Sequence, residues 1–225
     1  MKPIFDITPF SIVDFEGKIS AVVWFCGCNM RCVYCYNTKI VSATNGKFGA
    51  DDLYEFLKMR RNKLDAVVFS GGECTNCHEI LEILKCVKNL GFLNKIDTNG
   101  SNPDILAEIL KRNLADFISL DFKAGNEKFF KITKTNGYEN FIKSLKILVK
   151  SGVKFEVRTT IHSDFLNETE ISKMAGILEN YGYKGEYCLQ NFYVTDENFG
   201  NLKAPKIKFD PAKIKSNIKI KLRNF

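Results

Sequence analysis

The chain has 225 residues, 45% of them hydrophobic, and a formal net charge of +7 at pH 7. This length and apolar content suffice for one folded domain with a buried core, and they exclude an intrinsically disordered chain. No apolar leader follows Met1, and no stretch reaches the roughly 18 apolar residues of a membrane-spanning helix, so we expect a cytoplasmic protein that does not contact a membrane. In that reducing compartment we expect the eight cysteines to stay thiols or to bind metal.

Short apolar runs alternate with helical segments through the middle of the chain. We predict strands at residues 19–25, 66–69, 95–97, 117–120, 155–161 and 187–190. Helices are predicted at 51–61 with Asp51 as N-cap, at 77–90, 138–150 and 168–181, and from Asn102-Pro103-Asp104 onwards. This alternation indicates βαβ units, and six units are fewer than the eight of a closed barrel. The predicted fold class is therefore α/β, an incomplete (βα)6 parallel barrel in a single domain of residues 1–225 with its core at about 18–193.

The C-terminal extension, residues 203–225, carries the charge excess. It contains eight basic residues and one acid, Asp210, whereas basic and acidic residues balance in the rest of the chain. Ile218, Ile220 and Leu222 alternate with basic residues, which predicts a half-buried strand with a solvated basic face. Docking of an acidic protein partner is a second interpretation of the charge, and nucleic-acid binding is the least favoured one.

Polar residues gather at the carboxyl ends of the predicted strands, where parallel α/β barrels bind their ligands. They lie in residues 70–73, 97–100, 121–123 and 158–162 and at Gln190-Asn191. Gly71 and Gly72 would let a ligand approach the backbone, and Glu73 would offer a carboxylate to an amine. A plain strand-to-helix turn is the structural alternative for these three residues.

Four charged residues at these strand ends also have two interpretations each. Asp97 and Asp121 suit ribose hydroxyls or a hard cation, or else they cap helices. Arg158 and Lys123 suit a carboxylate, or else they are solvated charges or members of an internal ion pair.

Three cysteines, Cys28, Cys32 and Cys35, share one short loop after the first predicted strand. A structural zinc site would need a second knuckle or paired histidines, but the chain has two histidines far apart in sequence. Three thiolates can hold an iron–sulfur cluster and leave one iron open to a small molecule, and Tyr34 offers a flat face beside it. Sites for an amine, a carboxylate and a ribose next to an open iron together describe S-adenosylmethionine (SAM).

The motif Cys28-x-x-x-Cys32-x-Tyr34-Cys35, followed by Gly71-Gly72-Glu73, resembles that of the radical SAM superfamily. The resemblance covers roughly residues 8–195. It points to the activating enzymes of glycyl-radical enzymes, in particular to anaerobic ribonucleoside-triphosphate reductase activating proteins. It implies a barrel of radical SAM type and an oxidoreductase that generates a glycyl radical on a partner enzyme. The partner that the resemblance implies is anaerobic ribonucleotide reductase.

The same resemblance implies the site residues and cofactors. Cys28, Cys32 and Cys35 would bind three irons of a 4Fe–4S cluster and carry the catalysis, and the fourth iron would bind the amino and carboxylate groups of SAM. An electron from a flavodoxin- or ferredoxin-type donor would cleave SAM, and the resulting 5′-deoxyadenosyl radical would take a hydrogen atom from a glycine of the partner. The positions implied to contact SAM are Tyr34, Asn37, Gly71, Gly72, Glu73, Asp97, Asn99, Asp121, Lys123, Arg158 and Gln190. Asp97 and Asp121 would also be the positions for a monovalent cation.

Two departures from the family pattern concern cysteines. Residues 38–64 contain none, so the ferredoxin-like insert of some activating enzymes is absent from this stretch. Cys74 stands where relatives often have proline, and Cys77 follows it. We favour non-liganding thiols here over an auxiliary metal or redox role together with Cys26.

Two other functions remain as alternatives. The first is a small-molecule radical SAM enzyme similar to 7-carboxy-7-deazaguanine synthase, which is also short. The second is an iron–sulfur module without catalytic activity.

Overall fold

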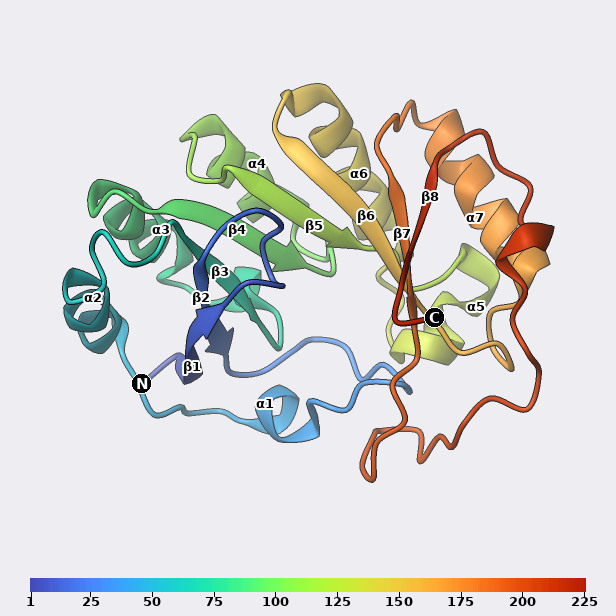
Figure 1. The fold of residues 1–225 in the computed structure, drawn as a ribbon, viewed down its shortest axis with the longest axis horizontal. Coiled ribbons are helices and arrows are strands. Elements are labelled where there is room, and N and C mark those ends of the chain that lie inside the picture. Colours follow the sequence, from blue (N-terminus) through green and yellow to red (C-terminus); the bar gives the residue numbers. More distant parts are fainter. The chain divides into compact units, whose positions relative to one another are not determined.

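The computed structural model describes all residues, 1–225 (Figure 1). The chain forms two compact units. The first unit comprises Met1–Asn29, Lys39–Thr98 and Asn102–Ser119, and the second comprises Met30–Thr38, Asn99–Ser101 and Leu120–Phe225. The single domain expected from the sequence stays a prediction. No helix combines the length and the apolar character that crossing a membrane requires.

The first unit is built on strands that neighbour one another in chain order. They are β1 (Ile4–Ser11), β2 (Ser20–Phe25), β3 (Ala66–Gly71), β4 (Leu93–Thr98) and the first residues of β5 (Phe117–Asp121). β1 runs antiparallel to β2, whereas β2, β3 and β4 pair in parallel. β2 and β3 are nearly continuous apolar runs with buried side chains, as expected for parallel strands that are covered on both faces.

Helices connect these parallel strands. They are α1 (Thr38–Ser42), α2 (Ala50–Lys58), the 3₁₀ turn η1 (Cys74–Asn76), α3 (Ile80–Asn89) and α4 (Pro103–Lys111). α3 shows the pattern clearly, because Ile80, Ile83, Leu84 and Val87 recur at helical spacing and are all buried. Figure 1 shows α3 packed beside the strands that precede and follow it.

The second unit holds the end of β5 and three further parallel strands, β6 (Lys154–Ile161), β7 (Tyr187–Asn191) and β8 (Ile220–Arg223). Its helices are α5 (Asn126–Thr133), α6 (Tyr138–Ser151), α7 (Glu168–Asn180) and the 3₁₀ turn η2 (Pro211–Lys213). Phe122 N donates to the Arg158 carbonyl at 2.7 Å, which joins the end of β5 to β6. The Phe122 ring stacks on Phe141 of α6 with 4.3 Å between centroids, so the helix is packed on the strands by aromatic contact.

The predicted strands and helices are all present, with five differences. The sequence reading missed β1, α1 and α5, and the helix expected at 77–90 begins at Ile80 because residues 74–76 form the separate turn η1. Asp51 is not the N-cap of α2. Gly49 takes that position, and its N–H donates to the Asp52 carboxylate at 2.8 Å.

The basic C-terminal extension begins as a strap, a name we give to residues 203–218, which run along α7 (Figure 1). The strap is held through its backbone N–H groups, which donate to side-chain oxygens of the loop before α7 and of α7 itself. The pairs are Lys206 N to Asp164 (3.0 Å), Asp210 N to Glu168 (2.6 Å), Lys215 N to Ser172 (2.9 Å) and Asn217 N to Glu179 (2.8 Å).

The strand expected within this extension exists as β8, but its faces differ from the prediction. Leu222 is exposed, whereas Arg223 is half-buried and forms a bidentate pair with Glu156 at 2.8 and 3.2 Å. The prediction of a solvated basic face is therefore wrong for Arg223, because an acidic partner on β6 draws this side chain inward.

We predict that acid releases the strap. The backbone N–H groups of Lys206 and Asn217 lower the pKa values of Asp164 and Glu179, respectively. Because both pKa values are lower in the folded chain, this stabilisation is complete above the unfolded values of about 4 and is lost as the pH falls through the folded values.

Amide hydrogen exchange, corrected for intrinsic rates, measures this release. Protection at residues 206, 207 and 217 should fall below about pH 4, while the amides of β3 stay protected. In the double variant Asp164→Asn/Glu179→Gln the protection should no longer change in that pH range. Equal acid sensitivity in this variant would contradict the assignment.

A second prediction concerns Gly176, in the middle of α7. No atom lies within 4 Å of the position that a Cβ would occupy, and its φ is not in the left-handed region. Gly176→Ala should therefore stabilise the protein by roughly 0.5–1 kcal/mol, because alanine loses less backbone entropy in a helix. Urea unfolding measures the change, and a destabilised variant would show that the site is more crowded than described.

Candidate functional site

Gly71 and Gly72 end β3 against the backbone that leads into the cysteine loop. Gly72 N donates to the Phe25 carbonyl, and Glu73 N donates to the Gly27 carbonyl, both at 2.9 Å. A Cβ on Gly72 would lie 1.7 Å from the Gly27 carbonyl oxygen, and Gly71 has a φ of +114°. The position of a Gly72 side chain is therefore occupied by the chain's own backbone, one residue before Cys28, and the approach of a ligand to these glycines stays a prediction.

Glu73 is a buried carboxylate held by neutral hydroxyl and amide donors. It is 2% exposed. Its Oε1 accepts hydrogen bonds from the Thr75 hydroxyl at 2.6 Å, the Thr98 hydroxyl at 2.7 Å and Thr75 N at 3.3 Å. These donors fix the orientation of the buried carboxylate.

Asp97, at the end of β4, is paired within the chain. Its Oδ1 accepts from Lys95 Nζ at 2.5 Å, and both side chains are largely buried. The Cys74 thiol donates to the Asp97 carbonyl at 3.5 Å, and burial raises the pKa of this thiol well above its usual value. Cys74 is therefore an unreactive structural thiol in this arrangement.

Asp121, Lys123 and Arg158 form a charge cluster in the second unit. Asp121 accepts from Arg158 Nε at 2.9 Å and from Lys123 Nζ at 3.0 Å. Burial by itself would lower the pKa of Lys123, but the nearby Asp121 charge outweighs it, and the pKa lies well above the usual value. The internal ion pair that we considered for Arg158 and Lys123 is present. Lys123 and Arg158 are thus positioned by one shared carboxylate.

Both predicted cation-site carboxylates thus already have a protein cation. Lys95 pairs with Asp97, and two basic side chains pair with Asp121. Neither aspartate caps a helix through its side chain, which was the structural alternative.

Tyr34 lies in the cysteine loop with its ring buried. Its hydroxyl has no hydrogen-bond partner, and burial raises its pKa well above the usual value. The charges of Lys123 and Asp121 act on it, as do the thiols of Cys32 and Cys35. A buried hydroxyl without a partner costs about 1–3 kcal/mol, so a bound polar ligand is the expected source of the missing hydrogen bond.

The three motif cysteines form no disulfide, and neither do the other five. Cys32 is buried, while Cys28 and Cys35 are partly exposed, and Cys35 N donates to the Cys32 carbonyl at 2.9 Å in a tight turn. No three His, Cys, Asp or Glu side chains converge on a single metal ion. Thiolates that each bind a different iron need not converge in that way, so three available thiols fit a cluster.

The remaining predicted positions vary in how firmly they are held. Asn99 is buried, and its Oδ1 accepts from Ser101 N at 2.9 Å, while the buried Ser101 hydroxyl has no partner. Asn37 and Gln190 are half-buried, in the loop after Cys35 and at the end of β7.

Sequence reasoning missed the residues that hold the acidic groups. Thr75 and Thr98 orient Glu73, and Lys95 neutralises Asp97. Lys95 could have been found, because side chains two positions apart in a strand lie on the same face, and Asp97 stands two positions after Lys95. Thr98 gave no such signal, because its contact joins two different strands.

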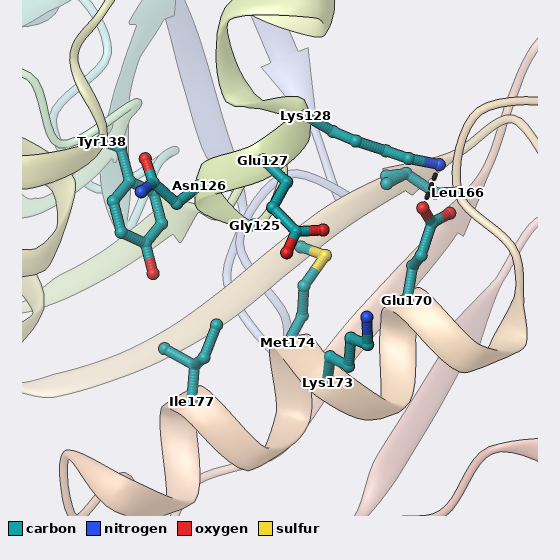
Figure 2. Close-up of a pocket in the computed structure, with 10 residues that line it drawn as sticks. All are labelled: Gly125, Asn126, Glu127, Lys128, Tyr138, Leu166, Glu170, Lys173, Met174 and Ile177. Carbon is teal, nitrogen blue, oxygen red and sulfur yellow. Dashed lines mark ion pairs between the residues drawn. The ribbon is translucent and has the colours of Figure 1, made fainter.

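A separate pocket of about 180 Å³ lies in the second unit between the start of α5 and α7. Figure 2 shows Glu127 and Met174 pointing into it and the Lys128–Glu170 ion pair at one side. None of the predicted site residues lines it.

Comparison with known proteins adds the family. A family model described as the Radical SAM superfamily matches residues 22–175. The chain is 32% identical over 209 residues to a protein of Methanocaldococcus jannaschii assigned as a glycyl-radical enzyme activating enzyme, with 89% of this chain and 85% of that protein covered. It is 34% identical over 187 residues to the pyruvate formate-lyase-activating enzyme of Clostridium pasteurianum, with 80% and 77% covered.

Among solved structures, the chain is similar to SuiB of Streptococcus suis bound to S-adenosylmethionine. The TM-score is 0.64 at 15% identity, over 90% of this chain and 52% of SuiB, so the chain spans about half of that protein. At this identity the likeness shows the fold alone. It confirms the predicted α/β fold class, an incomplete (βα)6 parallel barrel of radical SAM type.

The contact of Gly72 with Gly27 yields a third prediction. Gly72→Ala should destabilise the protein by roughly 1–3 kcal/mol, because a backbone carbonyl stands where the methyl group must go. Urea unfolding measures the change, with Gly176→Ala as the control that adds the same methyl group in open space. Equal stability of the two variants would show that the contact is not needed.

Proposed function

This chain belongs to the radical SAM superfamily, and we propose that it is an activating enzyme that forms a glycyl radical on a partner protein. Enzymes of this superfamily use a 4Fe–4S cluster and SAM, and this chain is such an enzyme. The observation that carries the proposal is the identity of 32% and 34% to two proteins named as activating enzymes over most of this chain.

In the proposed site Cys28, Cys32 and Cys35 hold the cluster through their thiolates. When bound, the cluster and SAM supply a one-electron cleavage whose product radical takes a hydrogen atom from a glycine. Two of the chain's charged groups match the two charged ends of the methionine moiety. Glu73 receives the ammonium group through its buried carboxylate, which the hydroxyls of Thr75 and Thr98 orient.

The other end of the methionine moiety meets a positive group. Arg158 and Lys123 face its carboxylate, and their shared contact with Asp121 fixes where the two basic groups lie. The Tyr34 hydroxyl, which is buried without a partner, gains a hydrogen bond from the bound cofactor. Asn37, Gly71, Gly72, Asp97, Asn99 and Gln190 complete the proposed SAM site.

The identity of the partners is a further part of the proposal. The segments Asp97–Gly100, Asp121–Ala124 and Arg158–Ile161 resemble those of anaerobic ribonucleotide reductase activating proteins, so we assign that reductase as the glycyl-radical partner. A flavodoxin- or ferredoxin-type protein supplies the electron. Eight cysteines without a disulfide and an oxidation-sensitive cluster suit the reducing cytoplasm, where we place the protein.

Our fourth prediction tests the cluster and the radical together. After anaerobic reconstitution, Cys28→Ser, Cys32→Ser and Cys35→Ser should each lose most of the bound iron, while Cys86→Ser and Cys188→Ser keep it, because only the first three thiols would bind the cluster. With dithionite and SAM, the wild-type protein should form 5′-deoxyadenosine and produce a glycyl radical on anaerobic ribonucleotide reductase, seen by electron paramagnetic resonance.

The outcomes separate the alternatives. If all five variants keep iron, the cluster assignment is wrong. If 5′-deoxyadenosine forms but neither the reductase nor pyruvate formate-lyase acquires a radical, a small-molecule radical SAM reaction replaces the activating function.

A further inference from the structure

The segment 197–202, which we call the clamp, lies along the cysteine loop within the second unit. Gly200 N donates to the Val33 carbonyl at 2.8 Å, and Phe199 N donates to the Cys35 carbonyl at 3.3 Å. Glycine is required at this contact, because a Cβ on Gly200 would lie 2.8 Å from the Val33 carbonyl oxygen. The clamp therefore follows the backbone of the loop that carries two of the three proposed cluster ligands.

The clamp leads directly into the strap. Asn198 closes the turn between them, because its side chain accepts from Leu202 N at 2.7 Å and donates to the Leu202 carbonyl at 3.0 Å. Lys203 follows Gly200 by three residues, and three extended residues span at most about 11 Å. The first lysine of the strap is thus held close to the backbone of the cysteine loop.

The strap is rich in lysine, with five lysines and one acid among residues 203–218. Its amides donate to Asp164, Glu168 and Glu179, whose carboxylates keep their negative charge. Lys203, Lys206 and Lys208 are exposed, and none forms a salt bridge. The lysines outnumber these acidic groups, so the strap surface keeps a net positive charge, and its first lysine lies near the cysteine loop.

Exposed apolar side chains lie among these lysines. Ile207 is 58% exposed between Lys206 and Lys208, and Phe225 is 50% exposed while its ring packs on Phe209 at 5.8 Å between centroids. Apolar residues surrounded by charges are typical of a protein interface. A surface for single-stranded nucleic acid would instead present stacked aromatic faces along a groove.

We propose that the strap is the docking surface for the electron donor, an acidic protein that carries one electron. The inference rests on the proposed function, since it deepens the account of how the cluster held by the cysteine loop is reduced. The docked donor gives up one electron to that cluster and leaves oxidised by one electron, with no bond made or broken. The clamp keeps the docked protein next to the loop.

Charge reversal tests the surface. The strap variant is Lys203→Glu/Lys206→Glu/Lys208→Glu. The control variant, Lys63→Glu/Lys143→Glu/Lys150→Glu, changes the net charge by the same amount at three exposed lysines outside the strap and without salt bridges. The probe is flavodoxin, a small acidic flavoprotein, and formation of 5′-deoxyadenosine is measured with reduced flavodoxin or with dithionite as the reductant.

We expect the flavodoxin-supported rate of the strap variant to fall at least about tenfold at low salt, because attraction between opposite charges speeds association. The control variant should change much less, and the dithionite rate should be the same in all three proteins. In the wild type, raising the salt from about 0.05 M to about 0.5 M should lower the flavodoxin rate alone. Titration calorimetry with oxidised flavodoxin should show binding to the wild type and the control but not to the strap variant.

Four outcomes would overturn the proposal. Equal flavodoxin rates in the strap and control variants exclude docking at the strap, while the proposed function stands. If the dithionite-supported rate of the strap variant falls as much as its flavodoxin-supported rate, the strap serves only to hold the cysteine loop. Loss of the glycyl radical on the partner with dithionite as reductant, while 5′-deoxyadenosine still forms, assigns the surface to the glycyl-radical enzyme. No 5′-deoxyadenosine from the wild type with dithionite refutes the proposed function itself.

Discussion

The contact between Gly72 and Gly27 is the constraint on which the first unit's part of the site depends. Two backbone segments approach so closely that a Cβ cannot be added at Gly72 without moving the Gly27 carbonyl. The hydrogen bond from Glu73 N to this same carbonyl then fixes where the Glu73 side chain begins. The start of the cysteine loop and Glu73 are therefore positioned by one contact. A displacement of Gly27 moves Glu73, and a displacement of Gly72 moves the start of the loop.

Glu73 and Asp121 illustrate two different environments for a carboxylate. Glu73 is buried and accepts hydrogen bonds from the hydroxyls of Thr75 and Thr98. Asp121 is partly buried and pairs with Arg158 and Lys123. Hydroxyl donors orient a carboxylate without adding charge, whereas basic partners also offset its charge.

The sequence predicted the parts of this molecule that follow from local pattern. Apolar runs and helix periodicity located the strands β2 to β7, and the cysteine spacing identified the loop. β1 was missed because its alternation is weak: its middle residues are half-buried, and two irregularities interrupt its register with β2. An ion pair between distant residues, such as Arg223 with Glu156, cannot be predicted from a single sequence. Each of the two charged residues, taken alone, is expected to be a solvated surface residue.

Gly71 and Gly72 lie where a side chain is excluded, as their pattern indicated. The sequence alone could not say whether a ligand or another part of the chain excludes it, and at Gly72 the backbone of Gly27 does so. Gly200 is the converse case, since nothing around it in the sequence marks it, yet its missing side chain lets the clamp lie on Val33. Gly72 and Gly200 both follow the cysteine loop in the chain, and each brings a distant segment against it. The loop is thus held by backbone contacts, which depend little on the identity of the side chains around it, and its cysteines form no disulfide.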